Sequence, residues 1–224
     1  MQSPLKHIIV EHNPRQQPID KAVILLHGLG ASANDFVPFV PALKLPEDLA
    51  VRFVFPQAPS MPVTINGGYV MPAWYDILEM SVERQVDIDH IVWSSNAINT
   101  LIDIQIQQGV PSTNIIVAGF SQGGAVAYHN VLTNNKKLAG LLALSTYFAT
   151  KEQVHQPIIN KNIAIKIDHG MYDDVVPMAL GVQAKTHLEA LGLRPVFSSY
   201  PAMHHLSNQQ LLDIGQWITQ VFNN

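Results

Sequence analysis

One short segment of the chain has the residue types and spacing of a catalytic serine. Residues 119–123 read Gly-Phe-Ser-Gln-Gly, which fits the pattern Gly-x-Ser-x-Gly of a nucleophile on a tight turn between a strand and a helix. The segment 114–118 before it, apolar from Ile115 on, is typical of a buried strand, and residues 125–131 after it are a good helix start. Small residues must flank the serine because the turn is tight. We therefore predict that Ser121 is a nucleophile.

Acyl transfer also requires donors for the negative oxygen that forms beside the serine. The backbone N–H of Gln122, at the expected start of a helix, is one predicted donor of this oxyanion hole. Residues 26–30, Leu-His-Gly-Leu-Gly, end an earlier apolar run, and their glycines permit close approach to a substrate. We predict the N–H of Leu29 as the second donor. His27 is interpreted as a residue that orients this loop through hydrogen bonds rather than as the base.

The acid of a serine triad is expected after the serine in the chain and beyond a late strand. Residues 167–177 offer Asp168, Asp173 and Asp174. Asp168 lies within or at the edge of the predicted strand, whereas the other two aspartates lie in the loop that follows. The spacing Gly-x-x-Asp-x-x-Val-Pro favours Asp173 as the acid.

The base is expected after the last strand, where His204 and His205 are adjacent. One of them must face the serine, and the residues alone leave both alternatives open. A His-His pair also suits zinc, but no third ligand accompanies it at helical or short-loop spacing. We therefore expect no metal site.

Short β-branched runs alternate with longer amphipathic segments along the chain, which predicts a mostly parallel sheet with helices on both faces. Residues 87–108 carry apolar side chains at helical spacing, and residues 207–210 read as a capping box before a terminal helix. In such sheets the functional site lies beyond the carboxyl ends of the strands. The strands are expected at 22–26, 52–55, 114–118, 138–144, 163–167 and 196–200.

Composition narrows the classes of function. The chain has 224 residues, a formal net charge of −4, 13% charged residues and no cysteine, which excludes a thiol nucleophile and thiolate metal sites. Its length fits one domain, 1–224. No polybasic run predicts nucleic-acid binding, and no apolar stretch approaches the ~20 residues of a membrane span. The first residues lack a secretory signal pattern, so a cytoplasmic location is expected.

Taken together, these motifs resemble the phospholipase/carboxylesterase family of α/β-hydrolases, which includes bacterial carboxylesterases and eukaryotic acyl-protein thioesterases. The resemblance extends over nearly the whole chain, and its most specific part is the combination of Met-Pro-Ala-Trp-Tyr-Asp-Ile with Gly-Phe-Ser-Gln-Gly-Gly. The matching segments are 26–30, 62–64, 71–77, 119–124, 138–140, 143–145 and the loops that contain Asp173 and His204.

The resemblance implies an α/β-hydrolase fold without a large lid domain, and a Ser-His-Asp triad that needs no cofactor. The implied reaction is hydrolysis of carboxylic esters, and of thioesters, by an acyl-enzyme mechanism. The alternative is a lysophospholipase or acyl-protein thioesterase that acts on long acyl chains. The implied partner is a small-molecule or lipid acyl ester, with weak homodimer formation. The segment from Met61 to Asp76 is expected to form part of the acyl-binding rim, with Val63, Met71 and Trp74 contacting substrate.

The family pattern also bears on the choice between the two histidines. Spacing upstream, from Met203, favours His205 as the base, whereas spacing downstream, through Leu206 and Ser207, favours His204 without a gap. We predict His204 as the base, with His205 as the alternative.

Overall fold

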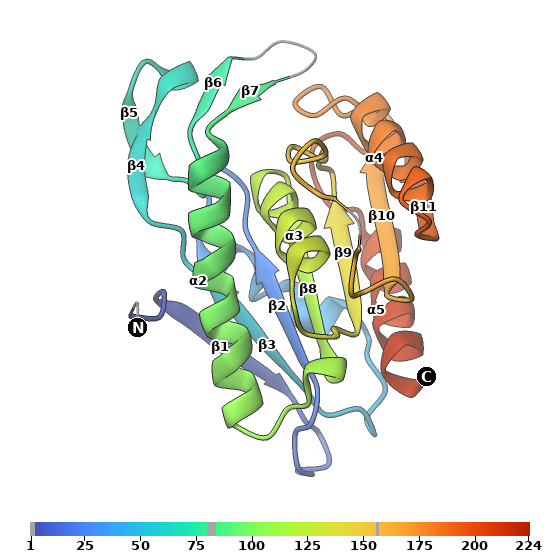
Figure 1. The fold of residues 1–224 in the computed structure, drawn as a ribbon. Helices are drawn as coiled ribbons and strands as arrows, with labels where there is room; N and C mark the ends of the chain where they lie inside the picture. The colour runs from blue at the N-terminus through green and yellow to red at the C-terminus, as the bar shows by residue number, and fades with distance from the viewer. Residues whose placement is uncertain (1–2, 80–83, 156) are drawn as a thin grey trace.

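A seven-stranded sheet forms the centre of the computed structural model, which describes residues 3–79, 84–155 and 157–224 (Figure 1). The first strand pairs antiparallel with its neighbour and all other neighbours in this sheet pair in parallel, so the prediction of a mostly parallel sheet is confirmed. In spatial order the strands are β1 (His7–His12), β3 (Val51–Pro56), β2 (Ala22–Leu26), β8 (Ile115–Phe120), β9 (Gly140–Leu144), β10 (Ala164–Gly170) and β11 (Pro195–Tyr200).

Helices cover both faces of the sheet, as predicted (Figure 1). One apolar cluster joins side chains of α2 (Ile88–Gln107), α3 (Gln122–Thr133) and α4 (Met178–Ala190) to one face. A second cluster joins α1 (Phe39–Ala42) and α5 (Asn208–Asn223) to the other face. No described helix is both long enough and apolar enough to cross a membrane.

The elements with continuous apolar or helical patterns lie where the sequence predicts them. Strands β2 and β9 are apolar throughout because helices cover both of their faces. The predicted capping box starts α5: the Gln210 N–H donates to Ser207 Oγ at 3.2 Å, and the Ser207 N–H donates to Gln210 Oε1 at 3.4 Å.

The sequence did not predict the shorter or half-exposed elements. β1 is an edge strand whose side chains alternate between half-buried and exposed, so it lacks the apolar run of an interior strand. The other unpredicted elements are the short helix α1, the antiparallel pair β4 (Ser60–Val63) and β5 (Tyr69–Pro72), the antiparallel pair β6 (Ile77–Glu79) and β7 (Gln85–Val86), and the 3-10 turns η1 (Ala33–Phe36), η2 (Thr64–Asn66) and η3 (Ser112–Asn114).

Parallel pairing brings the loops of the site to one edge of the sheet. β2, β8, β10 and β11 all end at this edge because they run in the same direction (Figure 1). The loops that follow them carry Leu29, Ser121, Asp173 and His204. The sheet therefore assembles residues that are far apart in the sequence.

The contact between α5 and the end of α1 leaves no space for a side chain at Gly215. A Cβ there would overlap the backbone oxygen of Leu43. Helix propensity alone favours alanine over glycine by up to about 1 kcal/mol, but overpacking costs about 1–3 kcal/mol. We therefore expect Gly215→Ala to lower the free energy of unfolding in urea by about 1–3 kcal/mol. The control Gln216→Ala, at an exposed position of the same helix, should stay within about 0.5 kcal/mol of wild type.

Candidate active site

Ser121 occupies a strained turn between β8 and α3. Its backbone has φ 53° and ψ −119°, in the half of φ space that residues with side chains rarely adopt. A Cβ at Gly119 would overlap the backbone of Gly123, and one at Gly123 would lie 2.6 Å from the carbonyl oxygens of Leu26 and His27. The expectation that only small residues fit on both sides of the serine is therefore confirmed.

The structure brings Ser121, His204 and Asp173 together through two hydrogen bonds. The Nε2 atom of His204 is 3.0 Å from Ser121 Oγ, and its Nδ1 atom is 2.8 Å from Asp173 Oδ2. Because a carboxylate only accepts hydrogen bonds, the Nδ1 atom of His204 carries a hydrogen. In the neutral ring, Nε2 is then free to accept from the serine hydroxyl. His205 is exposed and forms neither contact.

Asp173 is held by the backbone of its own loop. Its Oδ1 atom accepts hydrogen bonds from the N–H groups of Val175 at 3.0 Å and Val176 at 2.7 Å. Burial by itself would raise the pKa of this carboxyl, but the hydrogen bonds from His204 and Val176, with the nearby histidines, outweigh burial and hold the pKa below its ordinary value. Asp173 is therefore a carboxylate at neutral pH. The neighbouring Asp174 is exposed, and Asp168 lies within β10.

The two predicted oxyanion donors, the N–H groups of Leu29 and Gln122, belong to segments that adjoin Ser121. A Cβ added to Gly28 would lie 3.4 Å from Ser121 Cβ, so the loop of Leu29 passes directly beside the serine. The Leu29 N–H donates to no other residue in the part of the chain that the structure describes. Gln122 is the first residue of α3, and such N–H groups have no partner within their helix. Both donors are thus available to a ligand.

His27 organises the glycine loop, as the sequence indicates. Its Nδ1 atom donates to the carbonyl of Gly28 at 2.7 Å, and its Nε2 atom accepts from the N–H of Ala58 at 3.1 Å. Burial lowers the pKa of this imidazole, against the opposing effects of the Gly28 carbonyl and the Asp35 charge. A neutral ring with both nitrogen atoms bonded fixes the loop and is not available as a base.

The side chain of Gln122 joins α3 to the segment that follows β5. Its Oε1 atom accepts from the Trp74 N–H at 2.8 Å, and its Nε2 atom donates to the Tyr75 carbonyl at 2.7 Å. The indole N–H of Trp74 donates to the carbonyl of His27 at 2.8 Å. Trp74 therefore connects both of the loops that supply the expected oxyanion donors.

The burial of Trp74 and Val63 corrects the predicted substrate rim. Trp74 is 1% exposed and Val63 is 0% exposed, so neither side chain is accessible to a substrate. Both carry apolar side chains that pack inward, which the resemblance did not reveal. Met71 is partly exposed, and its sulfur atom would lie 3.6 Å from a Cβ at Gly30, which places it beside the glycine loop.

A largely apolar groove of about 390 Å³ instead lies at Ser121 and is lined in part by the glycine loop itself. Phe36, Phe39, Phe120 and Leu206 line it, and the sequence reasoning missed all four. The ring of Phe120 lies 4.7 Å from the ring of His204 and 6.1 Å from that of Phe36, measured between centroids. Phe36 and Phe39 closely follow the glycine loop, and Leu206 follows the histidine pair, which is the signal that could have identified them.

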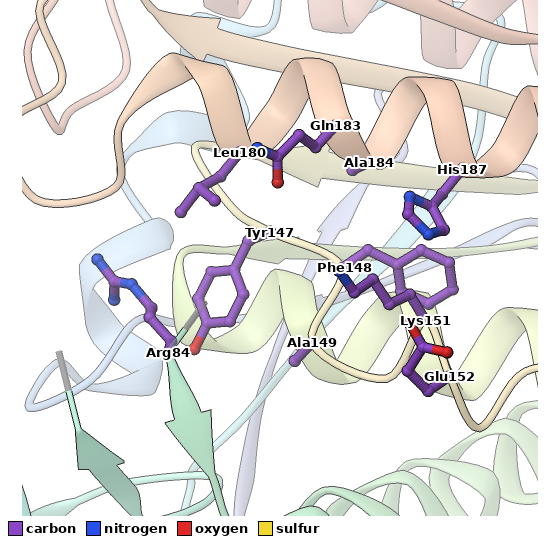
Figure 2. Close-up of a pocket in the computed structure, with 10 residues that line it drawn as sticks. All are labelled: Arg84, Tyr147, Phe148, Ala149, Lys151, Glu152, Leu180, Gln183, Ala184 and His187. Carbon is purple, nitrogen blue, oxygen red and sulfur yellow. The ribbon is translucent and has the colours of Figure 1, made fainter. Parts of the chain in front are cut away.

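A second cavity, of about 330 Å³, lies between α4 and the loop after β9 (Figure 2). None of the triad residues lines it. At one end the guanidinium carbon of Arg84 lies 5.0 Å from the ring centre of Tyr147, and the same guanidinium donates to the carbonyl of Val175. Arg84 thus connects this cavity to the loop that holds Asp173. Within the described ranges, no three His, Asp or Glu side chains are placed to hold a metal ion.

A serine, a histidine and an aspartate joined in this way at the carboxyl edge of a parallel sheet define an α/β-hydrolase. The model of the phospholipase/carboxylesterase family matches residues 7–222. The chain belongs to this family and is a hydrolase, so the resemblance stated from the sequence is confirmed.

Relatives and solved structures agree with this assignment. The chain is 36% identical to "Acyl-protein thioesterase 1" of Neurospora crassa over 85% of this chain and 82% of that protein. It is also 36% identical to the protein of that name in Debaryomyces hansenii, over 92% and 93% of the two chains. The crystal structure of Arabidopsis thaliana SOBER1 is 30% identical with a TM-score of 0.83, and covers 90% of this chain and 98% of its own. Zea mays acyl-protein thioesterase 2, 23% identical, shares the fold with a TM-score of 0.83 over 97% and 99% of the chains.

The Gln122 side chain can be tested apart from its backbone N–H. Gln122→Met keeps the volume and the N–H but removes both hydrogen bonds to Trp74 and Tyr75. We expect kcat/KM for p-nitrophenyl acetate to fall about tenfold to hundredfold because the glycine loop loses its support. Gln105→Met, at a fully buried glutamine of α2, is the matched control and should affect thermal stability more than activity. Wild-type activity in Gln122→Met would contradict this role.

Proposed function

We propose that the protein is a serine hydrolase that cleaves carboxylic ester and thioester bonds through an acyl-enzyme formed on Ser121. The observation that carries the proposal is the 3.0 Å contact between His204 Nε2 and Ser121 Oγ, in a ring whose Nδ1 donates to Asp173. This arrangement is the nucleophile, base and orienting acid of acyl transfer.

In the first half of the reaction, Ser121 Oγ attacks the substrate carbonyl carbon while His204 Nε2 takes the hydroxyl proton. The carbonyl oxygen becomes negative and accepts hydrogen bonds from the N–H groups of Leu29 and Gln122. Asp173 stabilises the protonated imidazole. The carbonyl re-forms as the bond to the leaving group breaks, and His204 passes its proton to the departing alkoxide or thiolate.

In the second half, water replaces the serine as nucleophile. His204 takes a proton from the water as its oxygen attacks the acyl carbon, and the same two N–H groups stabilise the new oxyanion. The bond between the acyl carbon and Ser121 Oγ then breaks, and the proton returns to the serine. The products are a free acid and the original enzyme, so no cofactor or metal is required by this mechanism.

The groove favours substrates with a short or medium-length apolar group. Its volume of about 390 Å³ is near the lower end of small-molecule pockets. The void beneath Phe36, Phe39 and Leu206 measures only about 20 Å³, so the groove does not continue on that side as a deep channel for a long chain. This supports a carboxylesterase. The alternative, an acyl-protein thioesterase or lysophospholipase, is supported by the names of the relatives at 36% identity.

The remaining expectations stay predictions. They are a cytoplasmic location, an acyl ester substrate of small-molecule or lipid type, no nucleic-acid partner, no integral membrane association and weak homodimer formation. Size-exclusion chromatography at several protein concentrations tests the last of these directly.

Replacing the triad residues one at a time tests the proposed roles. Ser121→Ala and His204→Ala should each lower kcat for p-nitrophenyl butyrate by at least about a thousandfold, since each removes a group that forms or breaks a bond. His205→Ala should lose less than about tenfold, or ~1.4 kcal/mol, because it only borders the groove. Circular dichroism would establish that each variant is folded. An inactive His205→Ala beside an active His204→Ala would show that the base was assigned wrongly.

A series of p-nitrophenyl esters from acetate to palmitate tests the groove. We expect the highest kcat/KM between butyrate and octanoate, because longer chains extend beyond the aromatic walls. Phe39→Ala should raise KM for the octanoate ester about tenfold, because the lost apolar contact is worth ~1.4 kcal/mol. KM for the acetate ester should change little. Phe222→Ala, in α5 and outside the groove, is the matched control. A maximum at palmitate, with fast hydrolysis of a palmitoyl-thioester peptide, would favour the thioesterase alternative.

A further inference from the structure

His169 lies near the end of β10, fully buried, directly beside the Asp173 carboxylate. Its Nε2 atom is 2.7 Å from the carbonyl oxygen of Val176 and 3.6 Å from Asp173 Oδ2. Because a carbonyl oxygen only accepts, Nε2 carries a hydrogen and His169 donates to Val176. None of the steps of the proposed reaction uses this histidine.

Val176 receives this bond on the residue that also holds the acid. Its N–H donates to Asp173 Oδ1 at 2.7 Å while its carbonyl accepts from His169. The neighbouring Val175 is bonded in the same manner: its N–H donates to Asp173 Oδ1, and its carbonyl accepts from Arg84. Both N–H groups and both carbonyls of this dipeptide are therefore occupied. Any shift of its backbone would move the carboxylate that His204 contacts.

The ring of His169 is held in one orientation and one charge state. Burial lowers the pKa of this imidazole more than the Val176 carbonyl and Asp173 raise it, so the ring is neutral near pH 7. Its Nδ1 atom has no hydrogen-bond partner among the described residues and faces Gly181 of α4, where a Cβ would lie 2.5 Å away. Val176 is thus the one described hydrogen-bond acceptor of the ring, and α4 packs closely against its other side.

We propose that His169 is a positioning residue for hydrolysis: by donating to Val176 it holds Asp173 in the orientation in which Oδ2 accepts from His204. The inference rests on the proposed function, because it assigns His169 a part in the same reaction. His169 acts through the geometry of a neutral donor and touches neither substrate nor reacting atoms.

Two substitutions separate the donor from the volume of the ring. His169→Met fills similar space without a donor, and kcat for p-nitrophenyl butyrate should fall about tenfold to hundredfold while KM stays nearly constant. His169→Gln places an amide N–H near the position of Nε2 and should restore most of that loss. His129→Met is the matched control: His129 is 7% exposed, lies on α3 and has an Nδ1 atom without a described partner. It should change thermal stability without changing kcat.

Proton NMR provides a readout that does not depend on turnover. The proton between His204 Nδ1 and Asp173 Oδ2 should give a far-downfield signal, which is identified by its loss in Asp173→Asn. We expect the signal in wild type and in His169→Gln. In His169→Met it should move upfield or broaden until it is not detected. If Ser121→Ala were still active but this NMR pattern held, the proposed function would fail, while the hold of His169 on the Asp173–His204 contact would stand.

Gly181→Ala places a methyl group against the same ring from α4. It provides a second test if His169→Met does not fold. The added Cβ should displace the ring, lower kcat and disturb the downfield signal. The inference is overturned if a folded His169→Met keeps wild-type kcat and signal. It is also overturned if His169→Gln and His169→Met lose activity equally, because volume and not donation would then be what matters.

Discussion

The backbone conformation of Ser121 is the constraint on which the site depends. A residue with a side chain at φ 53° and ψ −119° carries about 1–3 kcal/mol of strain and persists only where its surroundings fix it. Here the Ser121 N–H donates to the Leu144 carbonyl at 2.9 Å, and its own carbonyl accepts from Thr146 Oγ1 at 2.6 Å. Gly124 allows Thr146 to approach, because a Cβ there would lie 2.5 Å from its methyl group. The turn places Ser121 Oγ beyond the end of β8, where it contacts His204.

Around this turn, the polar groups of the site are arranged before substrate binds. Burial of His27 and His169 keeps both rings neutral, so each fixes a loop by hydrogen bonding without adding a charge next to His204. Asp173 is the buried charge closest to the base, and backbone N–H groups hold it. Because these groups do not have to reorganise during the reaction, they stabilise developing charge more effectively than water would.

The sequence predicted the parts of this arrangement that are local. The turn at Ser121, the strand β2 and the capping box at Ser207 are encoded within a few neighbouring residues, and the structure has them where they were expected. The choice between His204 and His205 could not be made from the residues alone, because it depends on how a loop after β11 folds against Asp173. The inward packing of Trp74 and the aromatic wall of Phe36 and Phe39 were missed for the same reason: they depend on contacts between segments distant in the chain.

The activation of Ser121 by His204 is tested most directly by the rate at which Ser121 reacts with a fluorophosphonate. Mass spectrometry of digested protein should place the adduct on Ser121 and not on Ser145, the buried serine directly after β9. The rate constant of labelling should fall at least about a hundredfold in His204→Ala and stay close to wild type in His205→Ala. Labelling at another residue, or an unchanged rate in His204→Ala, would contradict the claim that His204 activates Ser121.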